Sequence, residues 1–320
     1  MVDTDQPTVI VTETLAETPA KWLSARVNLL WCPLEDGDTL YHHLADAAGL
    51  LVRTYTQVNE ALLDRAPKLK VVGRAGVGLD NIDVEACRRR GVQVVYTPDA
   101  NTQAVVEYVL GLMLDDVRPR TNITAPLEPE RFHSLRKSEV GRQLDEHTLG
   151  ILGFGRIGKR LGRAAHALGM RLLVCDLLPE AELRAAVDYP FDYVDHDALY
   201  AGSDILSVHV DGRATNRHLI GRDALAKLRE QCLLINAARG MLVDADALAD
   251  WLKHNPAGRA VLDVHDPEPP PADYPLFGLP NARLLPHLAS RTERALENMS
   301  WVVRDIAAVL EGQSPQYPAP

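Results

Sequence analysis

The sequence is poor in cysteine, has no long apolar run and carries no excess of positive charge. Its four cysteines are scattered, and no two of them form a Cys-x-x-Cys pair; they are Cys32, Cys87, Cys175 and Cys232. Such spacing argues against a disulfide framework. We expect buried free thiols in a protein of the reducing cytoplasm.

No apolar stretch reaches the roughly 18 residues that a membrane-spanning helix needs. The first residues, Met1–Pro7, are polar and acidic, which is not the pattern of a signal peptide. We therefore expect a cytoplasmic protein without a membrane partner.

Lysine and arginine number 34 against 44 aspartates and glutamates, which gives a net charge of −10. An acidic chain of this kind is a poor candidate for binding nucleic acid or a membrane surface. The 320 residues, 46% of them hydrophobic, are enough for two domains with sizeable cores. We find no internal repeat and no low-complexity segment.

Short apolar runs alternate with helical patterns through the first third of the chain, which is typical of a parallel, doubly wound sheet. Helices are expected at 58–66 and 84–90, the second ended by Gly91. The expected strands are Thr8–Thr12, Asn28–Trp31, Leu50–Arg53, Lys70–Gly73 and Val92–Tyr96.

A long helix is expected from Asn101, its N-cap, to about Val117, because apolar residues recur there at helical spacing. The stretch Pro119–Glu146 that follows is polar and rich in proline. We expect it to leave the compact body, either as a disordered loop or as an arm that packs on a partner subunit.

A second α/β unit is expected from Leu149 to about Leu288. Its later strands are expected at Ile205–Val210, Cys232–Asn236, Ala260–Val264 and Arg283–Leu285. A single helix should close the chain, with Ser290-x-x-Glu293 as a capping box and Gly312 at its end. The tail Pro315–Pro320 should be extended.

The simplest organisation has a discontinuous first domain. Residues 1–101 and 289–320 would form a substrate domain, and residues 102–288 a nucleotide domain with a protruding arm at about 119–147. The two crossings would form a hinge, and a cleft between the domains would bind a small substrate.

The most informative motif is Gly-x-Gly-x-x-Gly at Gly153, Gly155 and Gly158, between a strand-like run and a helix-like run. Gly153 permits a tight turn, Gly155 lets a pyrophosphate approach the backbone, and Gly158 allows close packing of helix and strand. The helix N-terminus then offers free N–H groups and a partial positive charge to the phosphates. An ordinary turn without a ligand is the weaker alternative.

Asp176 ends the next apolar run, at about the spacing expected for the acid that binds the adenosine ribose. A carboxylate accepts from ribose hydroxyls but repels a 2′-phosphate, so the motif favours NAD over NADP. Its neighbours Leu177 and Leu178 offer no cation for such a phosphate.

Three side chains after predicted strands have the chemistry for hydride transfer to a 2-oxo acid. The guanidinium of Arg239 suits a planar carboxylate, and His287 is a natural proton donor near neutral pH. A carboxylate at Glu268 would orient the imidazole and keep it protonated. Each of the three alone also fits an ordinary surface residue.

The chain resembles the D-isomer-specific 2-hydroxyacid dehydrogenase family over essentially its full length. The matching blocks are Gly73–Asp83, Gly150–Gly158, Ile235–Gly240, Leu262–Pro269 and Pro286–His287. The resemblance implies an α/β fold of two doubly wound parallel-sheet domains, with a Rossmann NAD-binding domain inserted into a flavodoxin-like substrate domain. It also implies a homodimer that pairs through the nucleotide domains, and chemistry that needs no metal.

The resemblance assigns roles to matching positions. Arg239 would bind the substrate carboxylate and carbonyl, His287 would be the acid/base and Glu268 its partner. Besides the three glycines, the implied cofactor contacts are Arg156, Ile157, Asp176, His209, Val210, Ala237, Ala238 and Asp263. The implied substrate contacts are Arg53, Arg74, Gly76, Val77 and Gly78.

Three segments depart from the family pattern. The usual His-x-Pro-Leu is replaced by His209-Val210-Asp211-Gly212, and Leu288-Ala289-Ser290-Arg291 follows the histidine in place of the usual small residues. The excursion Pro119–Glu146 lacks the family's usual tryptophan. Cofactor contacts of the first segment and helix packing near the third are therefore less well defined.

Within the family, the segments around Arg53 and Arg74 most resemble phosphoglycerate dehydrogenases. Two arginines could pair with a substrate phosphate, and Arg136 or Lys137 of a neighbouring subunit could add a third cation. The two arginines could instead bind only a carboxylate or hold their loops. The chain ends at Pro320, so the regulatory domain of longer phosphoglycerate dehydrogenases is not expected.

We therefore expect an NAD-dependent D-2-hydroxyacid dehydrogenase acting on 3-phosphoglycerate and phosphohydroxypyruvate. One alternative is a reductase of hydroxypyruvate, glyoxylate or another 2-oxo acid. Another is a non-enzymatic, NAD-sensing protein like the corepressors of this family, since a fold alone does not define a function. Glu268 argues against formate oxidation, because formate dehydrogenases of the family have glutamine there.

Overall fold

The structure, a computed structural model, describes residues 6–118 and 120–320. The chain divides into two compact units, unit 1 (Met1–Asn101 and Ser290–Pro320) and unit 2 (Thr102–Ala289). The return boundary lies one residue later than expected. Most of the segment considered for a signal peptide, and residue 119 of the expected arm, fall outside the described residues. In the described ranges, no helix is both long and apolar enough to cross a bilayer.

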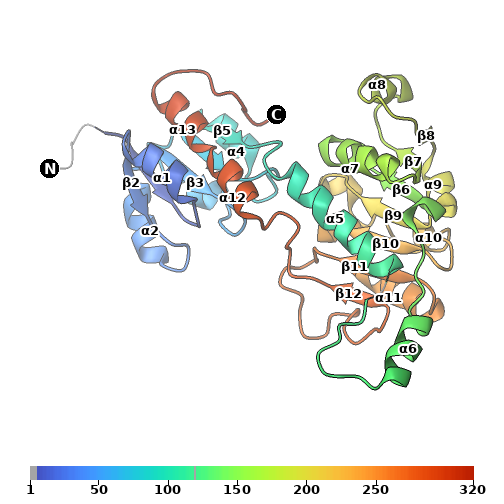
Figure 1. The fold of residues 1–320 in the computed structure, drawn as a ribbon. Helices are drawn as coiled ribbons and strands as arrows, with labels where there is room; N and C mark the ends of the chain where they lie inside the picture. The colour runs from blue at the N-terminus through green and yellow to red at the C-terminus, as the bar shows by residue number, and fades with distance from the viewer. Residues whose placement is uncertain (1–5, 119) are drawn as a thin grey trace. The chain divides into compact units, whose positions relative to one another are not determined.

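Unit 1 contains a five-stranded parallel sheet in the order β2-β1-β3-β4-β5 (Figure 1). The strands are β1 (Thr8–Val11), β2 (Asn28–Trp31), β3 (Gly49–Val52), β4 (Val71–Arg74) and β5 (Gln93–Tyr96). Every strand lies within one residue of its expected position. The order is that of flavodoxin-like sheets, so the expected fold of this unit is confirmed.

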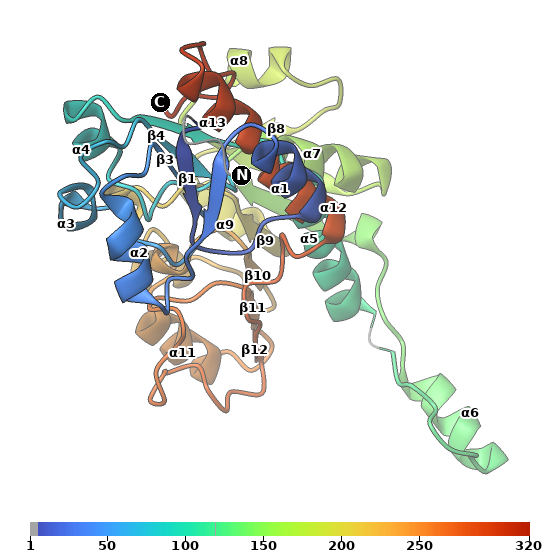
Figure 2. The ribbon, with the colours of Figure 1, turned by 90° about the vertical axis from the view of Figure 1, so that its left-hand side faces the viewer.

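Helices cover both faces of this sheet. They are α1 (Glu17–Ser24), α2 (Gly37–Leu44), α3 (Glu60–Leu63), α4 (Val84–Arg89), α12 (Glu293–Ser300) and α13 (Val303–Leu310). Apolar side chains of α2, α3 and α4 share one buried cluster with the sheet, and α1, α12 and α13 lie on the opposite face (Figure 2). A Cβ on Gly73 would lie 2.4 Å from Cδ1 of Ile306, so α13 packs directly on β4.

The C-terminal segment differs from its expected form in two ways. The expected single helix is two helices, and the cap of the first is Thr292, whose side chain accepts from the Ala295 N–H, so the predicted Ser290–Glu293 capping box is wrong. The extended tail pairs with the edge strand β5, where Tyr96 N–H donates to Tyr317 O and Ala319 N–H to Val94 O.

Unit 2 contains a seven-stranded parallel sheet in the order β12-β11-β10-β9-β6-β7-β8. The strands are β6 (Thr148–Leu152), β7 (Arg171–Cys175), β8 (Asp192–Tyr193), β9 (Ile205–Val208), β10 (Leu233–Asn236), β11 (Arg259–Leu262) and β12 (Ala282–Leu284). Two series of strands run outward from the β6–β9 junction, as in dinucleotide-binding domains. The expected fold is therefore confirmed here too.

Helices and short 3₁₀ turns connect these strands. The helices are α5 (Thr102–Val117), α6 (Pro129–Ser138), α7 (Arg156–Ala167), α8 (Glu180–Ala185), α9 (His196–Gly202), α10 (Arg222–Leu225) and α11 (Ala245–His254). The 3₁₀ turns are η1 (Leu144–Glu146), η2 (Ala214–Asn216) and η3 (Gly240–Leu242). One apolar cluster joins α5 and α7 to the sheet, and another joins α9, α10 and α11 to it. All four cysteines are free and buried, as expected.

The segment between α5 and β6 is neither a bare loop nor part of the core. It carries α6, in which no residue is buried, and Figure 2 shows this helix projecting from the body of unit 2. Its last turn carries the basic residues Arg136 and Lys137. The prolines and charges of this segment predicted that it leaves the compact body. They did not predict the ten-residue helix that begins at Pro129, a position at which a helix tolerates proline.

Candidate functional site

The glycine motif forms the expected strand–turn–helix. Gly153 follows β6 with φ +93°, a left-handed conformation that favours glycine. A Cβ there would lie 2.8 Å from Val210 N, and one on Gly158 would lie 2.3 Å from Gly153 O. Gly155 is the N-cap of α7 and has open space beside it. The free N–H groups of α7 can therefore receive a phosphate.

Asp176 lies beside this turn, at the end of β7. Its carboxylate accepts from Phe154 N–H at 2.5 Å and from Leu178 N–H at 2.9 Å. Leu177 and Leu178 are exposed, and the nearby Arg213 is held by Asp211 in an ion pair of 2.5 Å. Asp176 thus brings a carboxylate beside the glycine turn, with no free cation directly next to it among the described side chains, and its contact with a ribose stays a prediction.

His209 and Val210 follow β9 and pack against the glycine turn. The Nε2 atom of His209 lies 2.8 Å from Ser207 Oγ. Burial lowers the pKa of His209 to about 4, so its imidazole is neutral at physiological pH. The backbone of His209 packs against the glycine turn, and its neutral ring does not compete with His287 as a proton donor.

The loop after β10 presents Arg239. Asn236, the last residue of the strand, folds the loop: its side chain donates to Arg239 O at 2.8 Å and accepts from Ala238 N–H at 3.1 Å. The guanidinium of Arg239 donates to Ala238 O at 2.7 Å, and the residue is half-buried. Gly240 then packs so closely that a Cβ would lie 2.0 Å from His265 O.

Glu268 and His287 form the expected pair, although they are 19 residues apart in sequence. Nδ1 of His287 lies 3.0 Å from Oε2 of Glu268. Burial raises the pKa of Glu268, but hydrogen bonds from the His287 ring and the His265 N–H outweigh it, so the pKa lies below its ordinary value. The ionised carboxylate can only accept, so Nδ1 of His287 carries the proton of this bond and Nε2 is left for a substrate.

Asp263 anchors the segment that carries His287. Its carboxylate accepts from Leu288 N–H and Ala289 N–H at 2.8 Å each and from the Tyr108 hydroxyl at 2.9 Å. Its carbonyl accepts from His287 N–H at 2.8 Å. These bonds hold His287 at φ 56°, a left-handed conformation that is strained for a residue with a side chain. A contact of Asp263 with a nicotinamide amide stays a prediction.

In unit 1, Arg53 follows β3 and is only 6% exposed. Its Nη1 donates weakly, at 3.4 Å, to Thr14 O and Thr14 Oγ1. Burial and the nearby charge of Arg291 lower the pKa of Arg53. Across the part of the chain that the structure describes, no carboxylate forms an ion pair with Arg53 or Arg291. Two guanidinium groups thus lie near each other without an acidic partner in contact.

The carboxylate of Glu13 lies next to these cations but binds backbone instead. It accepts from the N–H groups of residues 53, 54, 55 and 56 at 2.9 to 3.1 Å, and from the Thr56 hydroxyl at 3.1 Å. Burial raises the pKa of Glu13, but these backbone bonds outweigh it and lower the pKa. Glu13 therefore shapes the loop that presents Arg53.

Arg74, Gly76, Val77 and Gly78 lie at the end of β4 and just beyond it. The Arg74 guanidinium donates to Ala75 O at 2.8 Å and covers Gly76, whose φ is 156°. A Cβ on Gly76 would lie 2.0 Å from Nη1 of Arg74, the movable end of a long side chain, so it is the positive φ that favours glycine here. Val77 and Gly78 are half-exposed.

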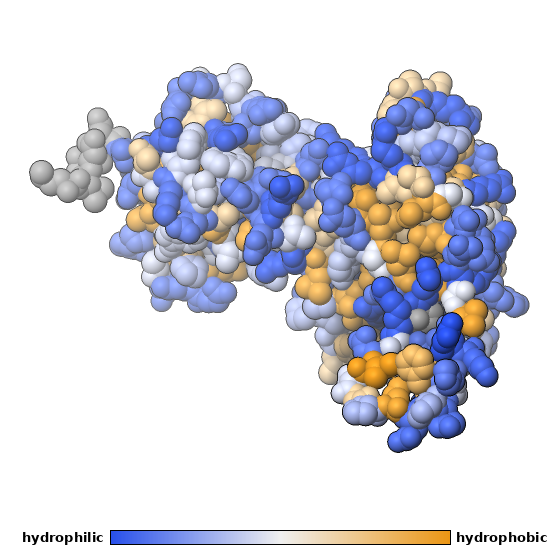
Figure 3. Space-filling view, viewed as in Figure 1, coloured by the Kyte–Doolittle hydropathy of each residue, from blue (hydrophilic) through white to orange (hydrophobic). Residues whose placement is uncertain are grey.

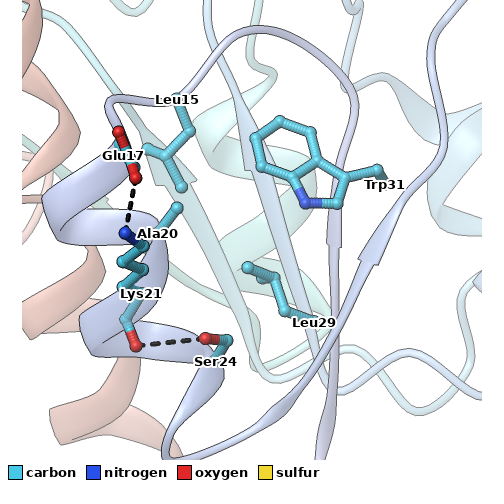
Figure 4. A pocket seen from close by; sticks show the side chains of 7 residues that line it. All are labelled: Leu15, Glu17, Ala20, Lys21, Ser24, Leu29 and Trp31. Atoms are coloured by element: carbon cyan, nitrogen blue, oxygen red, sulfur yellow. Dashed lines mark hydrogen bonds and ion pairs between the residues drawn. The ribbon is translucent and has the colours of Figure 1, made fainter.

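A hollow of about 430 Å³ lies elsewhere on unit 1, between α1 and β2 (Figure 4). Its wall includes the exposed ring of Trp31 and Lys21, which pairs with Glu17 at 2.5 Å. None of the predicted site residues lies there, and its cation is already neutralised. Within each unit, the strand ends that carry the predicted residues are therefore the stronger candidate for a functional role. In the described ranges, no group of three or more His, Cys, Asp or Glu is arranged to hold a metal.

Sequence reasoning missed four residues that hold others in place, Glu13, Tyr108, Asn236 and His265, and it also missed Arg291, whose charge lies near Arg53. Asn236 and His265 lie inside the matching blocks Ile235–Gly240 and Leu262–Pro269. Their positions in those blocks could therefore have indicated that they support the site. Tyr108 belongs to α5, and its hydroxyl bonds to Asp263, 155 residues further along the chain. Such distant polar contacts leave no local pattern.

Known proteins resemble this chain over most of its length. The model of the D-isomer-specific 2-hydroxyacid dehydrogenase NAD-binding domain matches residues 110–289. A D-3-phosphoglycerate dehydrogenase of Methanocaldococcus jannaschii is 38% identical over 86% of this chain. The chain covers 52% of that relative, so it spans about half the length of such relatives.

Two further proteins match over most of both chains. A hydroxypyruvate reductase of Thermotoga maritima is 34% identical over 81% of this chain and 83% of its own length. The crystal structure of the TT0316 protein from Thermus thermophilus superposes with a TM-score of 0.83 at 31% identity, covering 98% of this chain and all of that one. The likeness therefore includes sequence as well as fold.

Proposed function

Because the chain belongs to the D-isomer-specific 2-hydroxyacid dehydrogenase family, we propose that it transfers hydride between NAD(H) and a 2-hydroxy or 2-oxo acid. We further propose 3-phosphoglycerate and phosphohydroxypyruvate as its substrate pair. The observation that carries the proposed chemistry is the Glu268–His287 pair, in which Oε2 and Nδ1 lie 3.0 Å apart. The pair lies at the carboxyl ends of the strands of unit 2, which also carry the glycine turn and Arg239.

The residues of this edge divide the chemistry among them. When bound, NADH supplies the hydride that reduces C2 of the oxo acid. Arg239 holds the substrate carboxylate through its guanidinium fork. His287 donates the proton from Nε2 to the carbonyl oxygen, which becomes the hydroxyl of the product. Glu268 accepts from Nδ1 and stabilises the imidazolium before that transfer.

The residues around the glycine turn fit NAD. The open N-terminus of α7 beside Gly155 can receive the pyrophosphate, and Asp176 can accept from the two ribose hydroxyls. The same carboxylate would repel a 2′-phosphate. We propose that Arg156 and Ile157 meet the pyrophosphate, and that Val210, Ala237, Ala238 and Asp263 complete the contacts.

A phosphorylated substrate fits the cations of unit 1. Arg53 and Arg291 lie close enough to influence one another, and neither forms an ion pair with a carboxylate of a described residue. A dianionic phosphate would neutralise the two charges, and guanidinium groups bind it with paired hydrogen bonds. Arg74, Val77 and Gly78 are proposed to hold the rest of the substrate. A preference for phosphohydroxypyruvate would place the protein in serine synthesis.

Reduction of hydroxypyruvate is the second candidate, favoured by the Thermotoga relative, which matches over most of both chains. The two candidate substrates can be separated by measuring NADH consumption by the purified protein. Phosphohydroxypyruvate and hydroxypyruvate are assayed in parallel. We expect kcat/KM at least tenfold higher for the phosphorylated acid, a discrimination of about 1.4 kcal/mol. The reverse preference would make the protein a general oxo-acid reductase, and no activity with either would refute the proposal.

We also propose a homodimer that pairs through unit 2. Figure 3 shows apolar side chains gathered on this unit over α5 and beside α6. Large apolar side chains exposed there include Leu114, Ile123, Phe132 and Val140, and patches of this kind mark contact surfaces. The exposed α6 could then bring Arg136 and Lys137 to a neighbouring subunit. The free thiols support a cytoplasmic location.

A further inference from the structure

His265 is a buried histidine that contacts Glu268 and close neighbours of Arg239 and His287, but it has no role in the proposed chemistry. It is 8% exposed and lies three residues before Glu268, in the loop after β11. Its backbone N–H donates to Oε1 of Glu268 at 2.9 Å. His287 binds the other oxygen, Oε2. The two histidines therefore hold the two oxygens of one carboxylate.

The ring of His265 makes a second connection. Its Nε2 atom lies 2.9 Å from Leu285 O, two residues before His287. A carbonyl oxygen can only accept, so Nε2 carries a hydrogen. Nδ1 is buried and has no hydrogen-bond partner among the described side chains and backbone. The edge of the ring meets Tyr274, with centroids 5.6 Å apart.

Arg239 is connected to the same residue through its neighbour. A Cβ on Gly240 would lie 2.0 Å from both the carbonyl carbon and the oxygen of His265. The loop that presents Arg239 thus rests on the backbone of His265. Three loops, from β10, β11 and β12, meet at this one residue. Its contacts define the positions of Arg239, Glu268 and His287 relative to one another.

We propose that His265 is a positioning residue for the hydride-transfer reaction. Through Leu285 O it fixes the segment before His287, and through its N–H it fixes the carboxylate that orients the imidazole. Neither of these two hydrogen bonds involves the glycine turn or Asp176. Loss of the ring contact should lower kcat and leave cofactor binding unchanged. This inference rests on the proposed function, since kcat has meaning only for an active enzyme.

The test compares His265→Phe with His265→Gln. Phenylalanine keeps an aromatic ring against Tyr274 but cannot donate to Leu285 O, whereas glutamine can donate from Nε2. We expect His265→Phe to lower kcat by about 3- to 10-fold, the range for one neutral hydrogen bond. KM for NADH should stay within twofold, and His265→Gln should recover most of the lost kcat.

His147→Phe is the matched control. His147 is also buried, 7% exposed, and also makes one ring-to-carbonyl contact, Nδ1 to Gln143 O at 2.9 Å, but it lies just before β6, at the amino ends of the strands rather than their carboxyl ends. We expect this variant to lose thermal stability like His265→Phe while keeping its kcat. Equal kcat losses in the two variants, or a kcat within twofold of the parent in His265→Phe, would overturn the proposal.

Proton NMR gives a readout that needs no turnover. In the parent, the Nδ1 proton of His287 should be visible downfield, because its bond to Glu268 slows exchange with water. It should broaden in His265→Phe and return in His265→Gln. An inactive parent with this pattern would refute the proposed function and leave the positioning role supported. An active parent with the signal unchanged in His265→Phe would refute the positioning role alone.

Discussion

Arg239, Glu268 and His287 each follow a different strand of one parallel sheet. Their chemistry depends on neighbours that take no part in it: Asn236 folds the loop of Arg239, and Asp263 holds His287 at φ 56° through the adjoining N–H groups. Strained backbone of this kind persists only where surrounding bonds over-determine it. A change at these supporting residues should therefore affect the reaction without removing a reacting group.

Replacing Arg239 by alanine should lower kcat/KM for the oxo acid by about 10²- to 10⁴-fold, because the carboxylate would lose a charged, paired donor. NADH binding, measured by fluorescence titration, should survive. The kcat/KM of Arg239→Lys should lie between those of the parent and of Arg239→Ala, since lysine keeps the charge but not the planar fork of the guanidinium. Arg222→Ala, which breaks an exposed pair with Asp250, is the control and should be active. Near-normal turnover of Arg239→Ala would remove this residue from the mechanism.

Among single residues, residue type and local motif were enough to predict the three candidate catalytic residues and the glycine turn. They did not reveal that Glu268 is shared by two histidines, or that Asp263 bonds to Tyr108 across 155 residues. Hydrogen bonds depend on orientation and on distances of a few ångströms. Neither quantity can be read from spacing along a chain.

The β3–α3 loop shows how one half-buried acid shapes a whole loop. Glu13 follows β1, and its carboxylate collects four consecutive backbone N–H groups of the loop that begins at Arg53. Because β1 and β3 are neighbours in the sheet, their carboxyl ends bring the acid and the loop together. The loop is thus held in shape before any substrate binds.

Glu13→Gln should destabilise the protein by about 1–3 kcal/mol, because one oxygen acceptor becomes an amide donor that faces N–H groups. The pKa of Glu13 is lowered from its ordinary 4.5, so the folded protein binds this proton less readily than the unfolded chain. The stabilisation is therefore complete above pH 4.5 and is lost as the pH falls through the lowered pKa.

Urea unfolding at about pH 7 and about pH 4 measures both effects. We expect the free energy of unfolding to fall in Glu13→Gln at neutral pH and to depend less on pH than in the parent. Glu17→Gln is the control: its carboxylate is exposed and pairs only with Lys21 in a surface contact, so its loss should matter little. Indistinguishable stability of the two variants at neutral pH would contradict this account.

Strand positions in unit 1 were predictable to within one residue, since short apolar runs bounded by polar turns are strong local signals. The ends of the helices were less predictable. One apolar stripe runs through 296–310, yet the structure breaks it between α12 and α13. In the proline-rich excursion, α6 packs no side chain into a core and so leaves no apolar stripe. Periodicity identifies a buried face rather than a helix boundary.

The two units share a plan: parallel strands whose carboxyl ends carry the functional loops. In unit 2 these ends present the glycine turn, Asp176, Arg239, Glu268 and His287, as open α/β sheets generally present ligands. In unit 1 they present Arg53 and Arg74. Most of the large exposed apolar side chains belong to unit 2, and four of them lie on the surface proposed to pair two copies: Leu114, Ile123, Phe132 and Val140.

Leu114→Asp and Val140→Asp should each weaken the proposed dimer. Leu114 is 38% exposed on α5 and Val140 is 81% exposed after α6. A charge buried in a subunit contact should raise the dimer Kd by about 100-fold, or roughly 3 kcal/mol. Sedimentation at micromolar concentration should then show the mass shift from two chains toward one.

Trp31→Asp is the matched control, because Trp31 is a comparably exposed apolar residue of unit 1, at 51%. It should leave the mass unchanged. A parent that sediments as a monomer, or a Trp31→Asp variant that dissociates while the unit 2 variants do not, would contradict pairing through unit 2.

Local sequence was sufficient for what depends on near neighbours: the strands, the glycine turn, the acid after β7 and the candidate catalytic residues. It was also sufficient for the α/β class, because alternating strands and helices leave few ways to bury apolar surface. Folding alone brought Glu13 to the Arg53 loop, Arg291 near Arg53, and three loops together at His265. These contacts join residues far apart in the chain, and their strength depends on burial and bond geometry, which exist only once the sheets have formed.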